Sequence, residues 1–374
     1  MKVLLVGMSN RNFLIDLQNN LPKQQIAVDL LDLLEGYFID FAGNKKVYGQ
    51  KIVSKNFFKK NIQLYFNFYR IFNYFMTQNI HYDICNIHFL DPRYFFFKKQ
   101  LAKLANRMVI SMYGSDFYLY KKYDFFQKPL YKKAAALTFA NDKTRKSFDE
   151  YYHHKFSDKF AICRFGLSLL PLIKNAEEDT SAKHTALRDF NFPSDKIIIT
   201  IGINSSPNNQ QLEVIDALNQ IDDALKSNIF LVFPMTYGGF TNYCNDVDSA
   251  MAKTQIPYCI LRNYLSTDEL VSLRIASDLM INLPITDQLS ATMCEYLFTK
   301  NWVITGAWLP YEPIDQTGVN YHRIQGIDEL SSQLTDVLEH FSDYQQLAEQ
   351  NPKRIWNFSS WSHNITSWIE VYNT

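Results

Sequence analysis

The sequence lacks the features that mark several protein classes. Only 12 Gly and 12 Pro occur among 374 residues, which excludes collagen-like and low-complexity architectures. No apolar run reaches the ~18–20 residues that a membrane-spanning helix needs. The five cysteines form no C-x-x-C pair and no metal-ligand spacing with the histidines. We therefore expect reduced thiols in a cytoplasmic protein, and neither a disulfide framework nor a zinc site.

Several catalytic signatures are also missing. The chain contains no G-x-G-x-x-G loop and no Walker loop, so nothing indicates a dinucleotide-dependent dehydrogenase or a P-loop kinase. A G-x-S-x-G elbow is absent as well, which leaves a Ser-His-Asp hydrolase unsupported. What the chain does contain is 47% hydrophobic and 20% charged residues, a balance typical of folded domains with large cores.

The neutral total charge hides two oppositely charged halves. Residues 1–167 carry 26 Lys and Arg against 13 Asp and Glu, a net charge of +13. Residues 168–374 carry 12 against 25, a net charge of −13. This asymmetry predicts that each half has its own surface and its own partner.

The basic half combines cations with aromatic residues. Residues 43–80 contain seven cations and no acid, and residues 56–78 contain nine aromatic residues. A helix there would place Phe58, Tyr65, Tyr69 and Phe72 near one face, with Lys59, Lys60 and Arg70 toward another. Such a helix is suited to the interface of an anionic membrane, with contacts expected from Phe57, Phe58, Lys59 and Lys60.

Two other interpretations of this basic and aromatic segment were considered: an ordinary core helix, which stays open, and a nucleic-acid-binding surface, which we reject. It is equally compatible with an ordinary core helix whose cations are solvated, although a second cluster at residues 93–99, RYFFFKK, favours the membrane. Nucleic acid also binds basic aromatic surfaces. No RNP, KH or helix-turn-helix signature is present, so we expect no nucleic-acid partner.

Short apolar runs alternate with helix-length segments along the whole chain. This pattern predicts an α/β protein with two doubly wound, Rossmann-like domains that face a cleft. The boundaries we expect are an N-terminal domain at 1–167, a linker at 168–195 and a C-terminal domain at 196–355. A C-terminal helix at 356–374, which carries three Trp, is expected to pack back on the N-terminal domain.

The sharpest local signal lies at residues 277–297. An apolar strand ends at Pro284, a polar loop carries Asp287, and a helix opens at Ser290, Ala291 and Thr292 with Glu295 in its second turn. The opening amides of a helix bind phosphate, and a carboxylate one turn deeper accepts hydrogen bonds from the paired hydroxyls of a ribose. The alternative is an ordinary capped helix with an acid in its second turn.

This segment resembles a known enzyme family. The separation of Asp287 and Glu295 is that of the E-x7-E motif of glycosyltransferase family 4 and its GT-B relatives. The segment 111–116, SMYGSD, resembles the H-G-S-D turn of the acceptor domain, and 164–167, RFGL, resembles its closing N-G-V/I-D motif. The loops at 201–209 and 233–238 resemble those of bacterial fucosaminyltransferases that act on lipid-linked intermediates.

The resemblance is imperfect at the residues that would bind the diphosphate donor. Asp287 replaces the first Glu, and Tyr113 stands where many relatives have His. Asn204 and Ser205 occupy the positions of the usual Arg and Lys clamp. The missing charge would come from Arg262 on the donor side or from Arg164, which with Tyr113 we assign to acceptor binding.

The resemblance implies a glycosyltransferase of the hexosyl-transferring type that takes a nucleotide diphosphate sugar as donor. The expected acceptor is a lipid-linked saccharide of surface polysaccharide (capsule or exopolysaccharide) biosynthesis, bound at the cytoplasmic face of the cell membrane. No metal or other cofactor is expected, because no D-x-D stands on a suitable loop. Two rival interpretations are a sugar-nucleotide 2-epimerase and a catalytically silent partner subunit of the same fold.

The stereochemistry of transfer is left open by the sequence. Similarity to family 4 favours retention, with Asp287 near the donor sugar, and the fucosaminyltransferase-like loops weaken that preference. An inverting enzyme needs a general base in the first domain, and His88 and Asp116 both follow expected strand ends. His88 is equally compatible with a buried core histidine, and Asp116 with a helix cap.

Overall fold

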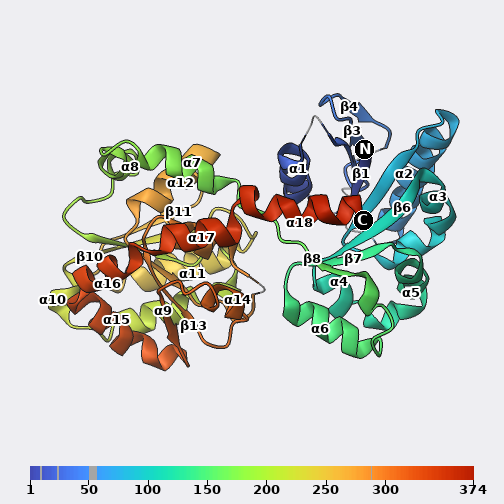
Figure 1. Ribbon diagram of the computed structural model, residues 1–374. Helices are drawn as coiled ribbons and strands as arrows, with labels where there is room; N and C mark the ends of the chain where they lie inside the picture. Colours follow the sequence, from blue (N-terminus) through green and yellow to red (C-terminus); the bar gives the residue numbers. More distant parts are fainter. Residues whose placement is uncertain (9–10, 23–24, 50–56, 288) are drawn as a thin grey trace. The chain divides into compact units, whose positions relative to one another are not determined.

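The computed structural model describes residues 1–8, 11–22, 25–49, 57–287 and 289–374, and it divides into two compact units (Figure 1). Unit 1 comprises Met1–Gly166 and Trp361–Thr374, and unit 2 comprises Leu167–Ser360. Each unit is a mainly parallel β-sheet between helices. The predicted α/β class with two doubly wound domains is therefore confirmed.

The sheet of unit 1 has the strand order β4-β3-β2-β1-β5-β6-β7-β8. Its strands are β1 (Lys2–Gly7), β2 (Ala27–Asp32), β3 (Tyr37–Ile39), β4 (Lys45–Val47), β5 (Tyr82–His88), β6 (Ala105–Met112), β7 (Ala136–Phe139) and β8 (Phe160–Ile162). The pairs from β2 through β1 to β8 are parallel, while β3 and β4 add an antiparallel edge. This edge was not predicted, because β3 and β4 have three residues each and β4 is fully exposed.

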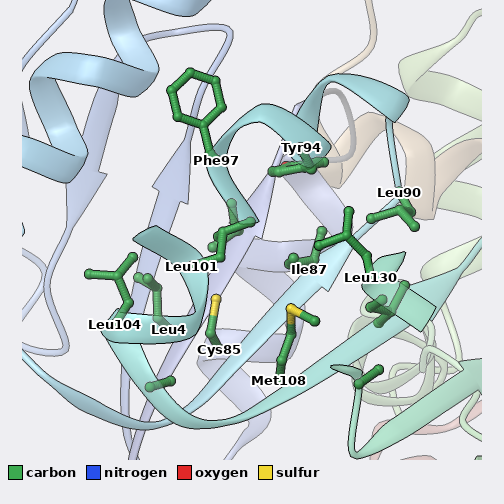
Figure 2. Packing of buried hydrophobic residues seen from close by; sticks show 14 of the residues in the cluster. Leu4, Cys85, Ile87, Leu90, Tyr94, Phe97, Leu101, Leu104, Met108 and Leu130 are labelled. Carbon is green, nitrogen blue, oxygen red and sulfur yellow. The ribbon is translucent and has the colours of Figure 1, made fainter. Parts of the chain in front are cut away.

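The central strands are apolar throughout because helices cover both faces of the sheet. Neighbouring residues of β1 enter different cores: Leu4 and Val6 face one cluster, and Val3 and Leu5 the other. Figure 2 shows the first cluster, where strand residues meet the helical segments η1 (Pro92–Phe97), α3 (Lys98–Leu104) and α5 (Asp124–Lys133). The labelled side chains are Leu4, Cys85, Ile87, Leu90, Tyr94, Phe97, Leu101, Leu104, Met108 and Leu130.

The last helix of the chain, α18 (Trp361–Asn373), completes unit 1. It packs beside α1 (Arg11–Asn20) on the second face of the sheet (Figure 1). Trp368 is fully buried there, and its indole N–H donates to the carbonyl of Arg164. The C-terminal segment thus returns to the N-terminal unit from Trp361, five residues later than the boundary expected at 356.

The remaining helical segments of unit 1 connect its strands. They are α2 (Phe57–Thr77), α4 (Ser115–Tyr118), η2 (Lys121–Tyr123), α6 (Asp142–Tyr151) and η3 (Ser157–Lys159). The predicted faces of α2 were wrong. Phe72 is 2% exposed and packs in the core, whereas Tyr69 is 67% exposed. Lys59 is exposed, while the side chains of Phe57, Phe58 and Lys60 lie outside the described residues.

Unit 2 contains a parallel six-stranded sheet in the order β11-β10-β9-β12-β13-β14. Its strands are β9 (Ile197–Ile201), β10 (Ile229–Pro234), β11 (Tyr258–Leu261), β12 (Leu279–Asn282), β13 (Trp302–Gly306) and β14 (His322–Ile324). The helical segments between these strands are η4 (Pro207–Asn209), α9 (Gln211–Leu218), α10 (Asp223–Lys226), α11 (Thr241–Met251), α12 (Thr267–Ala276), α13 (Ala291–Phe298) and α14 (Glu312–Asp315). After β14 come η5 (Ile327–Glu329), α15 (Leu330–Glu339), α16 (Phe341–Ala348) and α17 (Asn351–Ser359).

The expected linker at 168–195 was wrong, because this segment is part of unit 2. It forms α7 (Leu169–Glu177) and α8 (Ala182–Asp189), which pack on α12. Leu170 and Ile173 are fully buried in a core with residues of α13 and α17. The polar residues that suggested a linker stand on the exposed sides of these helices and in the turn between them.

Candidate functional site

The strand order of unit 2 defines where a ligand is expected. After β9 the chain moves outward to β10 and β11, and it then returns to place β12 on the other side of β9. The loops after β9 and β12 therefore leave the sheet side by side and continue in opposite directions. In parallel α/β sheets, this switch point at the carboxyl ends of the strands is the usual ligand site.

Hydrogen bonds join these two loops. The Asn208 side chain donates to the Thr286 carbonyl at 3.0 Å, and its main-chain carbonyl accepts from the Ile285 amide at 2.8 Å. The Gln210 side chain donates to the Leu283 carbonyl at 2.7 Å. Gly202 follows β9 with φ +69°, a left-handed conformation that favours glycine. The loop that carries Asp287 is thereby held against the loop after β9.

Helix α13 begins at this switch point. The Ser290 side chain caps the helix by accepting from the Met293 amide at 3.1 Å, and Ser290 is 4% exposed. The cap uses one amide of the first turn. The amides of Ala291 and Thr292 have no acceptor within the helix by its geometry, and they lie at the positive end of its dipole.

Glu295 lies in the second turn of α13, as predicted from the sequence, but it has a partner that the sequence did not reveal. Arg274 of α12 donates from Nε to Glu295 Oε2 at 3.0 Å, and its other nitrogens reach the same carboxylate and the Tyr296 hydroxyl. Burial raises the pKa of Glu295, and the Arg274 charge opposes part of that rise. All of the carboxylate contacts recorded in the described part of the chain use Oε2, so Oε1 keeps its acceptor capacity.

Asp287 is also held by a residue that the sequence did not reveal. The Tyr311 hydroxyl donates to Asp287 Oδ2 at 2.6 Å, and it accepts from the Asn282 side chain at 3.2 Å. Burial, followed by the charge of Asp287, raises the pKa of Tyr311, so the phenol stays protonated and remains a donor. The carboxylate is half-buried at the carboxyl end of β12.

Asn204 and Ser205 stand in the loop after β9, where they hold neighbouring chain segments. Asn204 Oδ1 accepts from the Ser206 amide and from the Asn209 side chain, both at 2.8 Å. Ser205 is 3% exposed and donates to the Tyr237 carbonyl at 2.7 Å. Their recorded contacts fix loop geometry, and donor binding by these two residues stays a prediction.

Arg262 follows β11, the edge strand, which is separated from β9 by β10. Its guanidinium pairs with Asp248 of α11 at 2.9 Å, and both side chains are more than 40% exposed. The structure therefore does not bring Arg262 together with Asp287 and Glu295, and a diphosphate contact from Arg262 stays a prediction.

The predicted residues of unit 1 gather at the carboxyl ends of β5 and β6. His88 Nδ1 lies 3.2 Å from the Tyr113 hydroxyl, and the rings of Phe165 and Trp368 contact the imidazole. His88 is fully buried, and burial lowers its pKa to about 3. His88 thus has the features of the buried core histidine that the sequence left open as an alternative, and a role as catalytic base stays a prediction.

Asp116 is fully buried as well. Its carboxylate accepts from the Leu90 amide at 3.1 Å and from the Tyr113 amide at 3.0 Å. Burial raises the pKa of Asp116 to about 6, although these bonds act to lower it. Asp116 therefore fixes the loops after β5 and β6 from within α4, where Gly114 and not Asp116 is the cap residue, and a catalytic role stays a prediction.

Arg164 lies next to β8. Its Nε donates to the Ala140 carbonyl at 3.2 Å, and burial lowers the pKa of the guanidinium. Tyr113 packs against the Phe165 ring, with 5.7 Å between the ring centroids. Acceptor binding by Arg164 and Tyr113 stays a prediction.

Sequence reasoning missed Arg274, Tyr311 and Asn208. Arg274 carries the one usable signal, since it stands between Leu273 and Ile275 in the apolar second half of α12, and a buried arginine needs a partner. Within the described ranges, no three His, Cys, Asp or Glu side chains are arranged to hold a metal ion. In the same ranges, no helix combines the length and apolarity needed to cross a bilayer.

Comparisons with known proteins agree with this architecture. Residues 2–141 match the model of a family described as glycosyl transferase 4-like. A glycosyltransferase from Rickettsia africae superposes over 100% of this chain and 97% of its own, with a TM-score of 0.73 and 16% identity. Anabaena HepE, solved with UDP and glucose, superposes over 100% and 99%, with a TM-score of 0.71 and 11% identity.

A third similar structure is sucrose-phosphate synthase from Thermosynechococcus elongatus, which covers 100% of this chain and 98% of its own. Its TM-score is 0.73 at 10% identity. The comparison with curated proteins gives no match. The finer likeness to fucosaminyltransferases stays a prediction. Residues 2–141 thus match a glycosyl transferase 4-like family, and the chain as a whole has the two-domain GT-B fold of these glycosyltransferase structures.

Proposed function

We propose that the protein transfers a hexosyl unit from a nucleotide diphosphate sugar to a saccharide acceptor, with the donor bound by unit 2. The observation that carries this proposal is the switch point between β9 and β12. There α13 begins, and the loop before it and its second turn carry two carboxylates, Asp287 and Glu295, that neighbouring side chains hold in place. UDP, seen with similar structures, has the matching parts: a diphosphate for the amides and a ribose diol for Glu295.

Arg274 supports this use of Glu295 because it binds Oε2 of the carboxylate and leaves Oε1 to accept hydrogen bonds from a ligand. Diol recognition needs an ionised, oriented acceptor, while burial alone would favour the protonated acid. Negative charge that develops on the leaving diphosphate would be stabilised by the α13 amides, so we propose that no metal ion is needed.

We further propose that transfer proceeds with retention at the anomeric carbon. In that mechanism the donor phosphate takes the acceptor proton, and the enzyme needs no base of its own. The burial of His88 and Asp116 supports retention, since neither side chain is placed to accept a proton from a substrate.

Nucleotide binding tests the donor site. Titration of UDP against the full chain, followed by thermal shift, should raise the melting temperature because UDP binds the native state. Glu295→Gln should weaken UDP binding by roughly 10–100-fold, since hydrogen bonds to a charged group are worth about 1.5–3 kcal/mol. Glu213→Gln, an exposed acid on α9, is the matched control and should leave UDP affinity unchanged.

A second variant covers the case in which Glu295→Gln does not fold. The double variant Arg274→Met/Glu295→Gln removes both buried charges together, a change that buried ion pairs often tolerate. If this folded variant bound UDP as tightly as the wild type, the donor assignment would be wrong. Release of UDP from UDP-glucose by the wild type is the accompanying test of transfer or hydrolysis.

We also propose that the acceptor is lipid-linked and that unit 1 lies on the inner face of the cell membrane, in surface polysaccharide biosynthesis. Helix α2 supports this with a stripe of exposed apolar side chains: Ile62 at 69%, Phe66 at 50%, Tyr69 at 67% and Met76 at 41%. Arg70 lies over the Phe66 ring at 4.6 Å, so a cation accompanies the stripe. Exposed apolar rows beside cations are typical of interfacial helices.

Flotation with anionic and neutral vesicles tests membrane binding. The wild type should float with anionic vesicles, and Phe66→Asp/Tyr69→Asp should lose most of that fraction. Tyr264→Asp is the matched control, because Tyr264 is 76% exposed but lies in unit 2. Equal recovery of the wild type and the α2 variant would contradict a membrane-facing α2.

A further inference from the structure

Unit 1 contains a pocket that none of the predicted site residues explains. It has a volume of about 460 Å³, within the about 300–1,000 Å³ of small-molecule sites. Its lining comes from the first turns of α2, from η1 after β5, and from η2 and α5 after β6. The pocket therefore opens near the carboxyl ends of two neighbouring strands, where α/β folds place their ligands.

Aromatic rings form most of its walls. They are Tyr65, Phe96, Tyr120, Tyr123 and Phe126. Phe96 bridges two of them, with centroids 5.8 Å from Tyr65 and 5.8 Å from Phe126. Phe96 is nevertheless 56% exposed, so a large part of this side chain is not covered by protein.

Three polar side chains share one region of the lining. The Arg93 guanidinium donates to Asp91 from Nε at 2.7 Å and from a terminal nitrogen at 2.6 Å. Its remaining terminal nitrogen donates to Asn61 Oδ1 at 2.8 Å. Burial acts to lower the pKa of Arg93, but the hydrogen bonds and charge of Asp91 raise it. The pocket thus offers fixed donors and acceptors with no net charge from this pair.

The two kinds of lining match one class of ligand. A sugar ring has C–H faces that stack on aromatic rings and a rim of hydroxyls that pair with planar polar groups. Tyr65 and Tyr120 add phenol groups that burial keeps protonated, so each both donates and accepts. We propose that this pocket binds a neutral saccharide ring of the acceptor, a proposal that rests on the glycosyl-transfer function above.

Other ligand chemistries fit less well. A phosphate group needs uncompensated positive charge, and Asp91 already neutralises the one arginine in the described lining. An alkyl or isoprenoid chain makes no use of Asn61, Asp91 and Arg93, which would lose water without gaining partners. A neutral polyol alone uses both the rings and the polar groups.

Saturation-transfer NMR on the full chain tests the pocket with methyl glycosides of glucose, galactose, mannose and N-acetylglucosamine. At least one glycoside should receive saturation, strongest at the ring protons of one face. Phe96→Ala should weaken its affinity by roughly threefold to tenfold, the usual worth of an aromatic contact. Phe125→Ala is the matched control: Phe125 is 77% exposed, packs beside Phe126, and is not among the described lining residues.

Competition with other ligands gives further outcomes. Inorganic diphosphate and hexanol are each added to the complex of the protein with the glycoside. If either one displaces the glycoside, the pocket recognises phosphate or alkyl groups, and the proposal is overturned. Equal glycoside binding by Phe96→Ala and the wild type, or no binding of any glycoside, would overturn it too. UDP binding measured on the same samples separates the two proposals, because Phe96→Ala leaves unit 2 unchanged. A wild type that binds a glycoside but not UDP would contradict the donor site alone.

Discussion

Both units hold an arginine against a carboxylate near the loops assigned to ligands, but the two ion pairs differ in burial. In unit 2 the side chains of Arg274 and Glu295 are 6% and 10% exposed. In unit 1 those of Arg93 and Asp91 are 25% and 7% exposed, and the pair lines an open pocket. The first arginine is enclosed by protein, whereas the second meets water.

The two arginine–carboxylate pairs therefore differ in how they respond to the loss of one partner. A buried pair is sensitive to the loss of one partner, because the remaining charge has no water to replace it. The pair of unit 1 is expected to lose less when its arginine is removed, because Asp91, although its side chain is only 7% exposed, also accepts from the Arg93 main-chain amide and keeps that donor. We therefore interpret Arg274 as a residue that positions and ionises Glu295, and Arg93 as one that presents polar groups to a ligand.

The largest expected effect comes from breaking the buried pair. Arg274→Met should lower the free energy of unfolding by about 3–5 kcal/mol, because Glu295 would stay buried without its partner. Arg93→Met should cost only about 1–2 kcal/mol, because Asp91 keeps the main-chain amide of residue 93 as a hydrogen-bond donor. Urea unfolding of both variants, followed by circular dichroism, measures the contrast. Equal losses would mean that the main-chain donor of Asp91 does not distinguish the two pairs.

Acid should reveal a second contrast, between two buried groups of unit 1. His88 has a pKa of about 3, below its usual 6.5, so its contribution to stability is lost as pH falls below 6.5. Asp116 has a pKa of about 6, above its usual 3.8, so its contribution is gained as pH falls through 6. Between pH 6 and 4 the two effects oppose each other, each by up to about 1.4 kcal/mol per pH unit.

Single variants should separate the opposite effects of His88 and Asp116 on the pH dependence of stability. Relative to the wild type, His88→Gln should become more stable on acidification from pH 6 to 4, and Asp116→Asn should become less stable. Melting temperatures across this range provide the measurement, and the difference from the wild type cancels the titration of the remaining carboxylates. The same sign of change in both variants would contradict the burial of one of the two groups.

Much of the fold could be predicted because a parallel sheet covered on both faces leaves long apolar runs. The alternation of such runs with helix-length segments was enough to predict two α/β domains, as observed. The β3–β4 hairpin was missed because three-residue edge strands carry no such run. Helices α7 and α8 were missed because their polar residues lie on the exposed side, and composition alone suggested a linker.

The candidate site could be predicted only for residues that lie close together in the sequence and form a recognisable motif. Asp287, Ser290 and Glu295 lie within nine residues, so their spacing could be recognised. Their partners Arg274 and Tyr311 come from other elements, and only the packed structure brings these side chains to the carboxylates. The burial of His88 and Asp116 could not be predicted, because a position near a strand end does not reveal whether a side chain faces solvent or core.

The smallest expected effect concerns the second carboxylate of unit 2. Tyr311→Phe removes the hydroxyl that links Asn282 to Asp287 and leaves the buried ring in place. A hydrogen bond to a charged group is worth about 1.5 kcal/mol at the low end, so donor turnover should fall by roughly tenfold. UDP release from UDP-glucose measures this. Tyr321→Phe, which removes a hydroxyl bonded to Asp315 in the same unit, is the control and should keep wild-type turnover. Equal rates for both variants would mean that Asp287 does not need Tyr311 to contact the donor. Of the two carboxylates, Glu295 alone would then depend on a neighbouring side chain for its position.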